Sequence, residues 1–326
     1  MKQANLGLDL TTKKTRKREF LEEMERVVPW AALVALIEPH SPRAKTGRPP
    51  FPIQTMLRIH FMQQWFGLSD PAMEEALFDV PMYREFAQLP EGLVRLPDES
   101  TILRFRHLLE KHGLAAQMFA AVNATLGAKG LMLKTGSVVD ATLIAAPSST
   151  KNSTGTRDPD MHQTKKGNNW YFGMKAHIAV DADSGLVHHQ ICTAANVHDL
   201  RVVDQLLQGT EKHVFADSGY RGIEKWSRRK RIRWSIAMTP GKRKALDMSK
   251  PIDVLKDKVE YVKASIRAKV EHPFRVVKRP FGYAKARYRG LAKNSAQVTT
   301  LFMLSNLWMA RRRLVGTVCT SPSAIA

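Results

Sequence analysis

The sequence predicts an α/β fold, with a mixed sheet preceded by a small all-α domain. Residues 53–129 place apolar side chains at helical spacing, whereas short β-branched runs take over after Gly130. The predicted order after Gly130 is three strands, helix, strand, helix, strand and a long final helix. Antiparallel pairing of the first three strands, extended by helix-linked strands, gives one mixed sheet.

The first part of the chain has the pattern of a basic arm, helices and a linker. A basic run at 13–18 leads into an amphipathic helix that ends near Pro29, and the Pro- and Gly-rich residues 38–50 are expected to form an exposed connector. Further helices are predicted at about 56–67, 69–78, 83–89, 101–112 and 114–126. Their start and stop signals are Ser69, Asp98 or Ser100, Gly67 and Gly113.

After Gly130, strands are predicted at 137–144, 171–181, 186–193, 214–217 and 233–238, with a polar loop at 147–167. Two of these strands carry an aspartate: Asp140 interrupts one apolar run, and Asp217 ends another. An unpaired buried charge is very costly, so each carboxylate must lie at a strand end or sheet edge, or have a partner. Both are therefore candidates for chemistry.

A third acid, Glu271, lies on the basic helix that is predicted to begin near residue 257. At about 100° per residue this helix has an apolar stripe made of Ile266, Val270, Phe274 and Val277. Beside it runs a charged stripe made of Arg267, Glu271, Arg275 and Lys278. Glu271 is thus expected at the border of the core between cations, and Pro273 is expected to kink or break the helix.

Composition excludes several classes of protein. The 326 residues are enough for two domains, and only two cysteines are present, so a disulfide framework is not expected. An apolar signal core and a run of about 18 apolar residues are both missing from the sequence. We expect a soluble protein of the reducing cytoplasm, with no membrane partner.

The positive charge is concentrated in the last third of the chain. Residues 221–326 hold 26 Lys and Arg against 6 Asp and Glu, whereas residues 1–220 hold 25 against 24. The formal net charge is +21, so nearly all of the excess lies around and beyond Glu271. This asymmetry favours a track for a polyanion, most commonly nucleic acid, over a merely solvated basic face.

Three carboxylates beside a basic flank suit metal-assisted phosphoryl transfer. Hard oxygen ligands hold Mg²⁺ or Mn²⁺, and two ions roughly 3.5–4 Å apart would activate the attacking oxygen and stabilise the leaving one. Neighbouring cations would then hold the phosphate backbone. The expected cofactor is a pair of divalent ions bound by Asp140, Asp217 and Glu271.

Several longer motifs identify a family. They include residues 47–52, residues 161–168, the run Val139-Asp-Ala-Thr142, the run Ala216-Asp-Ser-Gly-Tyr220 and residues 264–274. From Arg16 to Trp308 the chain resembles the DDE transposases of bacterial insertion sequences, most closely the insertion-sequence-five family. The resemblance implies a ribonuclease-H-like fold, with Asp140, Asp217 and Glu271 as the catalytic metal ligands.

The resemblance also suggests DNA contacts. The family's signature on the last helix is Tyr, Arg, Glu and Lys, and here Arg267, Glu271 and Lys278 match it. The tyrosine position is Ala264, while Tyr261 lies three residues earlier. Further contacts to DNA are expected from Lys165, Lys166, Trp170, Arg275, Arg287 and Arg289.

The predicted function is that of a nucleoid-associated transposase. It would bind the terminal inverted repeats of its element, free a 3′-OH by hydrolysis and join that hydroxyl to target DNA, as a homodimer or higher multimer. The alternatives are a ribonuclease-H-like DNA nuclease and a catalytically silent DNA-binding repressor. The predicted parts are a basic arm, helix and linker (1–48), a helical domain for DNA-end recognition or dimerisation (49–130), the catalytic domain (131–290) and a basic C-terminal helix and tail (291–326).

Overall fold

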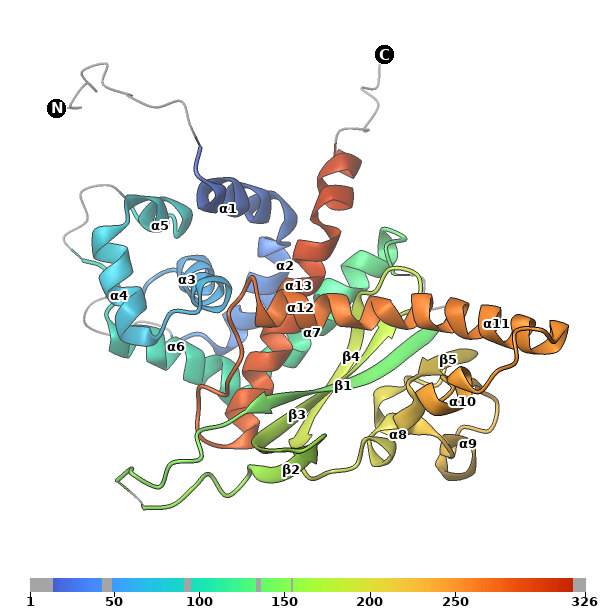
Figure 1. The fold of residues 1–326 in the computed structure, drawn as a ribbon. Helices are drawn as coiled ribbons and strands as arrows, with labels where there is room; N and C mark the ends of the chain where they lie inside the picture. The colour runs from blue at the N-terminus through green and yellow to red at the C-terminus, as the bar shows by residue number, and fades with distance from the viewer. Residues whose placement is uncertain (1–13, 43–48, 91–94, 133–135, 154, 319–326) are drawn as a thin grey trace, which may run out of the picture.

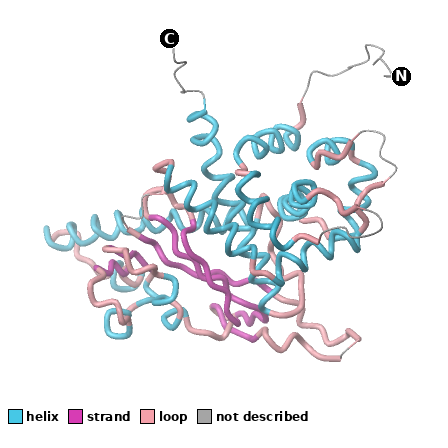
Figure 2. Tube along the Cα trace, turned by 180° about the vertical axis from the view of Figure 1, so that it is seen from behind, coloured by secondary structure: helices cyan, strands magenta, loops and turns pink. Residues whose placement is uncertain are grey.

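The computed structural model describes residues 14–42, 49–90, 95–132, 136–153 and 155–318. Helices gather at one end, a six-stranded sheet lies at the other, and a long helix passes between them (Figure 1). Figure 2 shows the same division from behind. Within the described ranges, no helix is long and apolar enough to cross a membrane.

The N-terminal part is helical, as predicted. Its elements are α1 (Arg16–Val27), α2 (Trp30–Ile37), the 3-10 turn η1 (Glu38–His40), α3 (Ile53–Phe66), α4 (Asp70–Asp79), α5 (Pro81–Phe86), α6 (Glu99–Lys111) and α7 (Leu114–Ala128). The predicted caps are confirmed, because the side chains of Ser69 and Asp98 accept hydrogen bonds from the backbone N–H groups of Ala72 and Thr101. Residues 43–48 of the predicted connector lie outside the described residues.

The sheet is mixed, as predicted. Its strands are β1 (Ser137–Ala145), β2 (His162–Lys166), β3 (Asn169–Asp181), β4 (Val187–Ala194), β5 (His213–Ala216) and β6 (Arg233–Ile236). The order is β2-β3-β1-β5-β6, with β4 also paired to β3. β1, β3 and β4 pair antiparallel, whereas β5 and β6 run parallel to β1. The sheet therefore has an antiparallel half and a parallel half that meet at β1.

The structure corrects one prediction for this region. Residues 162–166, predicted as part of a polar loop, form β2 and pair with the start of β3 as a hairpin. Gly167 turns the hairpin with a φ of +61°, in the left-handed region that favours glycine. Short elements between the strands are η2 (Asp199–Arg201), α8 (Val203–Leu206), η3 (Ser218–Tyr220) and α9 (Ile223–Trp226).

The last part of the chain contains α10 (Pro240–Lys244), α11 (Pro251–Arg267), η4 (Ala268–Val270), α12 (Glu271–Lys278) and α13 (Leu291–Val318). The helix around Glu271 is not continuous, because η4 separates α11 from α12. Pro273 is the third residue of α12, where a backbone N–H has no intrahelical partner to lose. The predicted break is thus real, but it lies before Glu271.

Helix α13 joins the two ends of the molecule. It packs against α3 and α7 on one side and against β4 and α12 on the other, so one hydrophobic core includes both the helices and a face of the sheet. Asn306 is fully buried in this core. Its Oδ1 accepts from Val187 N at 2.8 Å, and its Nδ2 donates to Asn123 Oδ1 at 2.9 Å. One side chain therefore ties α13 to both β4 and α7.

Candidate active site

Asp140 lies on β1, and Asp217 directly follows the neighbouring strand β5. β1 and β5 pair Ser137 with Val214 and Val138 with Phe215, and the same offset of 77 residues takes Asp140 to Asp217. Parallel strands lie about 4.8 Å apart, and residues at one level point to the same face. The strand pairing therefore brings the first two predicted acids together, and both are half-buried.

Each aspartate is oriented by a backbone N–H close to it. Asp140 Oδ1 accepts from Ala141 N at 2.7 Å, and Asp217 Oδ1 accepts from Gly219 N at 2.9 Å. A Cβ on Gly219 would lie only 3.0 Å from that Asp217 oxygen. Glycine at position 219 therefore allows the tight turn that holds the second carboxylate at the end of β5.

Glu271 is brought to the same region by η4. This short segment contacts β1 and β3, Val270 is buried, and Lys269 Nζ donates to Ala182 O at 2.6 Å just beyond β3. Glu271 directly follows Val270, the last residue of η4. It begins α12 and is exposed. The predicted apolar stripe anchors the helix, since Val270, Phe274 and Val277 are buried and Ile266 is half-buried.

Asp140 is affected electrostatically by both other acids. Burial first, and then the negative charges of Asp217 and Glu271, raise the pKa of Asp140 to about 6. The Ala141 N–H and the Arg267 guanidinium oppose this rise but do not cancel it. The ionised form of Asp140 is therefore disfavoured by its burial and by the charges of the two other carboxylates.

The donor chemistry fits a hard divalent ion. The three side chains offer carboxylate oxygens alone, which is the ligand type that Mg²⁺ and Mn²⁺ prefer. A bound cation would stabilise the charged form of Asp140, which burial and the two neighbouring carboxylates disfavour. Among the residues with a described position, however, no three His, Cys, Asp or Glu side chains already converge on a single point.

Two cations of the predicted signature lie next to the acids. Arg267, at the end of α11, is half-buried and acts on Asp140. Lys278 Nζ donates to Thr142 Oγ1 at 2.5 Å and to Leu143 O at 3.3 Å, so it is fixed against β1. Burial lowers the pKa of Lys278, and the charge of Lys166 lowers it further while Glu271 raises it.

The other predicted DNA contacts are divided between two places. In the β2–β3 hairpin Lys165 lies opposite Trp170, which is 67% exposed, and Lys166 is close enough to act on Lys278. Arg275 is exposed on α12. Arg287 lies over the ring of Tyr283, and Arg289 Nη2 donates to Thr156 Oγ1 at 3.1 Å.

The sequence reasoning missed a polar network at the same end of the sheet. Lys175 Nζ donates to Asp199 Oδ1 at 2.9 Å, and His177, which is buried and paired with Ala141, exchanges a hydrogen bond with Thr193 Oγ1 at 2.9 Å. Tyr220 is buried, and burial followed by Asp199, Asp140 and Asp217 raises its pKa well above the ordinary value. The sequence did contain a signal for this network, because Lys175 and His177 are polar residues at alternate positions in a mostly apolar strand.

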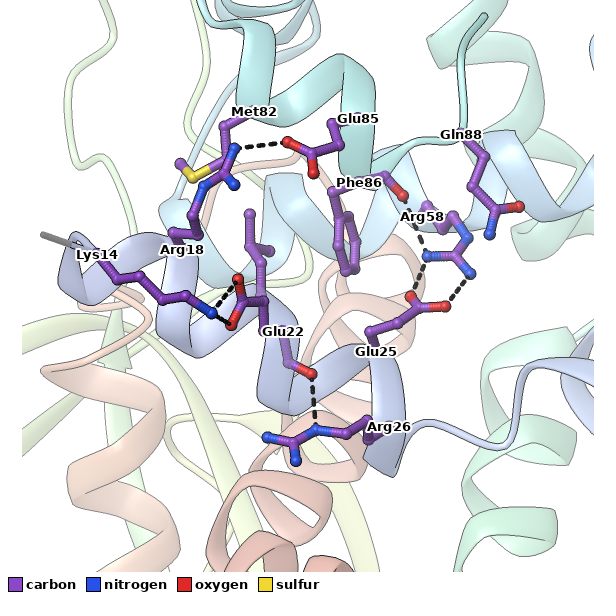
Figure 3. Close-up of a pocket in the computed structure, with 11 residues that line it drawn as sticks. Lys14, Arg18, Glu22, Glu25, Arg26, Arg58, Met82, Glu85, Phe86 and Gln88 are labelled. Carbon is purple, nitrogen blue, oxygen red and sulfur yellow. Dashed lines mark hydrogen bonds and ion pairs between the residues drawn. The ribbon is translucent and has the colours of Figure 1, made fainter. Parts of the chain in front are cut away.

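A different cluster of charges lies in the helical region. A cavity of about 660 Å³ is lined by α1, α3 and α5 (Figure 3). Its acids point at cations: Glu22 at Lys14 (2.8 Å), Glu85 at Arg18 (2.6 Å) and Glu25 at Arg58 (2.7 Å). Because the acids Glu22, Glu25 and Glu85 are already paired, the cavity does not offer acids open to a bound cation, as the site on the sheet does.

Comparison with known families agrees with the class that this fold and site suggest. Residues 132–307, more than half of the chain, match the family model described as "Transposase DDE domain". The chain therefore belongs to the family of DDE transposase domains. Residues 9–108 match a second model, described as "Transposase domain (DUF772)". No solved structure matches the chain.

Proposed function

We propose that this chain is the transposase of an insertion sequence of the insertion-sequence-five type, binding the terminal inverted repeats of its element and cutting and joining DNA there. The observation that carries the proposal is the alignment of Asp140 on β1 with Asp217 at the end of the adjacent β5, with Glu271 acting on Asp140 from α12. The sheet, with four antiparallel strands (β1 to β4) followed by two that run parallel to β1, supports a ribonuclease-H-like catalytic domain.

Asp140, Asp217 and Glu271 are the proposed ligands of two divalent ions. When bound, such ions would activate the attacking oxygen and stabilise the leaving oxygen. In the first reaction water attacks a phosphorus at the element end, the P–O3′ bond breaks, and the 3′ oxygen takes up a proton. In the second reaction the freed 3′-OH loses its proton and attacks a target phosphorus, the target's own P–O3′ bond breaks, and the displaced 3′ oxygen takes up a proton.

The cations of the site have a separate role in this proposal. Arg267 and Lys278 are held beside the acids, where they would bind the phosphates that flank the scissile bond. Lys165, Lys166 and Trp170 on the hairpin would contact the DNA near the cleaved end, the indole by stacking on a base. The basic surplus of residues 221–326 would hold the rest of the backbone.

The test is a cleavage and a gel-shift assay on one duplex that contains an element end. Asp140→Ala, Asp217→Ala and Glu271→Ala should each abolish cleavage and joining while binding is retained, because each removes a ligand and not a phosphate contact. Activity should need Mg²⁺ or Mn²⁺ and disappear with a chelator. Cleavage that survives the chelator, or any of the three substitutions, contradicts the assignment.

The same assay separates the alternatives. A nuclease would cut the duplex without forming the joined product, and a silent repressor would shift the duplex without cutting it. Inverted repeats flanking the coding sequence, together with a short target duplication, would favour the transposase before any protein is made. The helical residues 49–130 are the proposed reader of the element end or the dimerisation unit.

A further inference from the structure

Helix α11 carries an apolar stripe that faces solvent. Its members are Ile252, Leu255, Val259 and Val262, each between 47% and 59% exposed, and we name them the α11 seam. At about 100° per residue the four side chains fall within roughly 80° of one another. Their 3-4-3 spacing is that of the contact line between two packed helices.

Side chains of α11 outside the seam attach the helix to the body of the molecule. Glu260, buried on this helix, accepts from Met238 N at 2.7 Å, Lys263 Nζ donates to Ile236 O at 3.1 Å, and Arg243 Nε donates to Asp257 Oδ1 at 2.6 Å. These contacts fix the helix against β6 and α10. Both views show α11 reaching outward past the strands, on the side away from the N-terminal helices (Figures 1 and 2). The seam is therefore rigidly presented.

The charge around the seam differs from the rest of the last third. Residues 251–266 hold three Lys and three acids, whereas the other residues of 221–326 hold 23 Lys and Arg against three acids. Two of the three lysines are also paired within the helix, Lys256 with Asp253 and Lys263 with Glu260, each at 2.7 Å. The seam thus lies in a neutral segment of a strongly basic region.

The lack of net charge around the seam indicates which kind of molecule can bind it. DNA is held through cations at its phosphates, and here the segment has no net positive charge. An acidic partner helix would need unpaired lysines on both flanks, but on the flank that carries Lys256 and Lys263 both are already paired, which leaves only Lys258 on the other flank. Two chains of net charge +21 repel each other, so they can make close contact only where the local charge is low.

We propose that the α11 seam is the contact between two copies of this chain. The inference deepens the proposed function, on which its significance rests, because α11 leads through η4 directly into Glu271. A pair formed through α11 would hold two sets of acids at a fixed separation, as the joining of two element ends requires. With four apolar side chains from each copy, the free protein should pair weakly, with a Kd on the order of 10 μM.

The test is sedimentation velocity of the full chain without DNA, which does not depend on the proposed chemistry. The wild type should change from monomer to dimer as its concentration rises, and more readily at high salt, because salt screens the repulsion between the basic bodies. The double variant Leu255→Glu, Val259→Glu should weaken pairing by about 100-fold or more. It should unfold as the wild type does, since both side chains are exposed.

Tyr261→Glu is the matched control, because Tyr261 is 70% exposed on the same helix but lies off the seam. It should pair as the wild type does. A wild type that stays monomeric at about 200 μM overturns the proposal. So does pairing that the double variant leaves intact, or a monomer that instead binds a synthetic acidic amphipathic peptide through the seam.

Discussion

Two regions of this molecule gather carboxylates and cations, and they arrange them in opposite ways. In the helical cavity the acids are paired: Arg58, for example, is buried between the rings of Trp30 and Phe86 and forms two hydrogen bonds to Glu25. On the sheet, Asp140 faces two further acids and its pKa is raised. The first arrangement satisfies its charges within the fold, whereas the second leaves charge to be satisfied by something that binds.

The largest expected effect concerns the acids on the sheet. Asp140→Asn keeps the size of the side chain but removes a ligand, so cleavage should fall by at least about 10³-fold. The free energy of unfolding at pH 7 should rise by roughly 1–2 kcal/mol, because the pKa of about 6 shows that the charged form is disfavoured in the folded state. Cleavage and urea unfolding measure the two changes.

Glu224→Gln is the control for this prediction, because Glu224 is an exposed acid on α9. It should change neither cleavage nor stability. A loss of stability in Asp140→Asn would mean that the carboxylate is satisfied within the fold, and the contrast between the two regions would fail.

The helical part of the molecule and the sheet should also respond to acid with opposite signs. Burial, followed by the charge of Arg106, lowers the pKa of His60 from 6.5 to about 4. The stability that neutral His60 provides is present above pH 6.5 and is lost as the pH falls to 4, by up to roughly 3 kcal/mol. Asp140 has the opposite effect. The free-energy cost of holding its charged carboxylate in the folded protein is complete above pH 6 and disappears below pH 3.8, the ordinary pKa of an aspartate.

The measurement is urea unfolding between pH 7 and 4 for the wild type, His60→Gln and Asp140→Asn. His60→Gln should flatten the loss of stability on acidification, and Asp140→Asn should steepen it. Equal pH profiles for all three proteins would contradict both assignments.

A smaller effect is expected for an ion pair of the helical cavity. Glu25→Gln leaves Arg58, whose side chain is 1% exposed, without its charged partner, and should cost roughly 1–3 kcal/mol of unfolding free energy. Glu22→Gln removes a pair that is open to solvent and should have no measurable effect. Denaturant unfolding of the two variants compares them directly. Equal losses of unfolding free energy would show that burial does not determine how much these ion pairs stabilise the fold.

The smallest effect concerns the salt dependence of DNA binding. Lys166→Gln removes an exposed cation near Lys278 and should lower the slope of log K against log salt by about 0.9. Lys14→Gln, whose charge is already paired with Glu22, should leave the slope unchanged. Fluorescence anisotropy titrations over a range of salt measure both, and a change for Lys14 alone would place the DNA track on the helical side.

Sequence patterns predicted local features well and long-range ones poorly. Ser69 and Asp98 could be predicted as caps because each capping hydrogen bond joins residues only three positions apart in the sequence. The proximity of Asp140 and Asp217 depends on the pairing of β5 with β1, which no local pattern predicts; a shared site for the two acids was implied by the family resemblance. β2 was missed because its side chains are polar and mostly exposed, so no alternation marks it. The Lys175–Asp199 pair joins residues 24 apart, and no local pattern predicts such a contact.

Helix α13 also constrains the order in which the molecule can be completed. It is the last element of the described chain, yet it fills the space between α7, α3 and β4. Until it has been synthesised, those apolar faces have nothing to pack against, and the nascent chain is exposed to aggregation. A frameshift or stop codon that removes only α13 should therefore yield insoluble protein and no partly working enzyme, so even a late lesion in the gene should silence this copy.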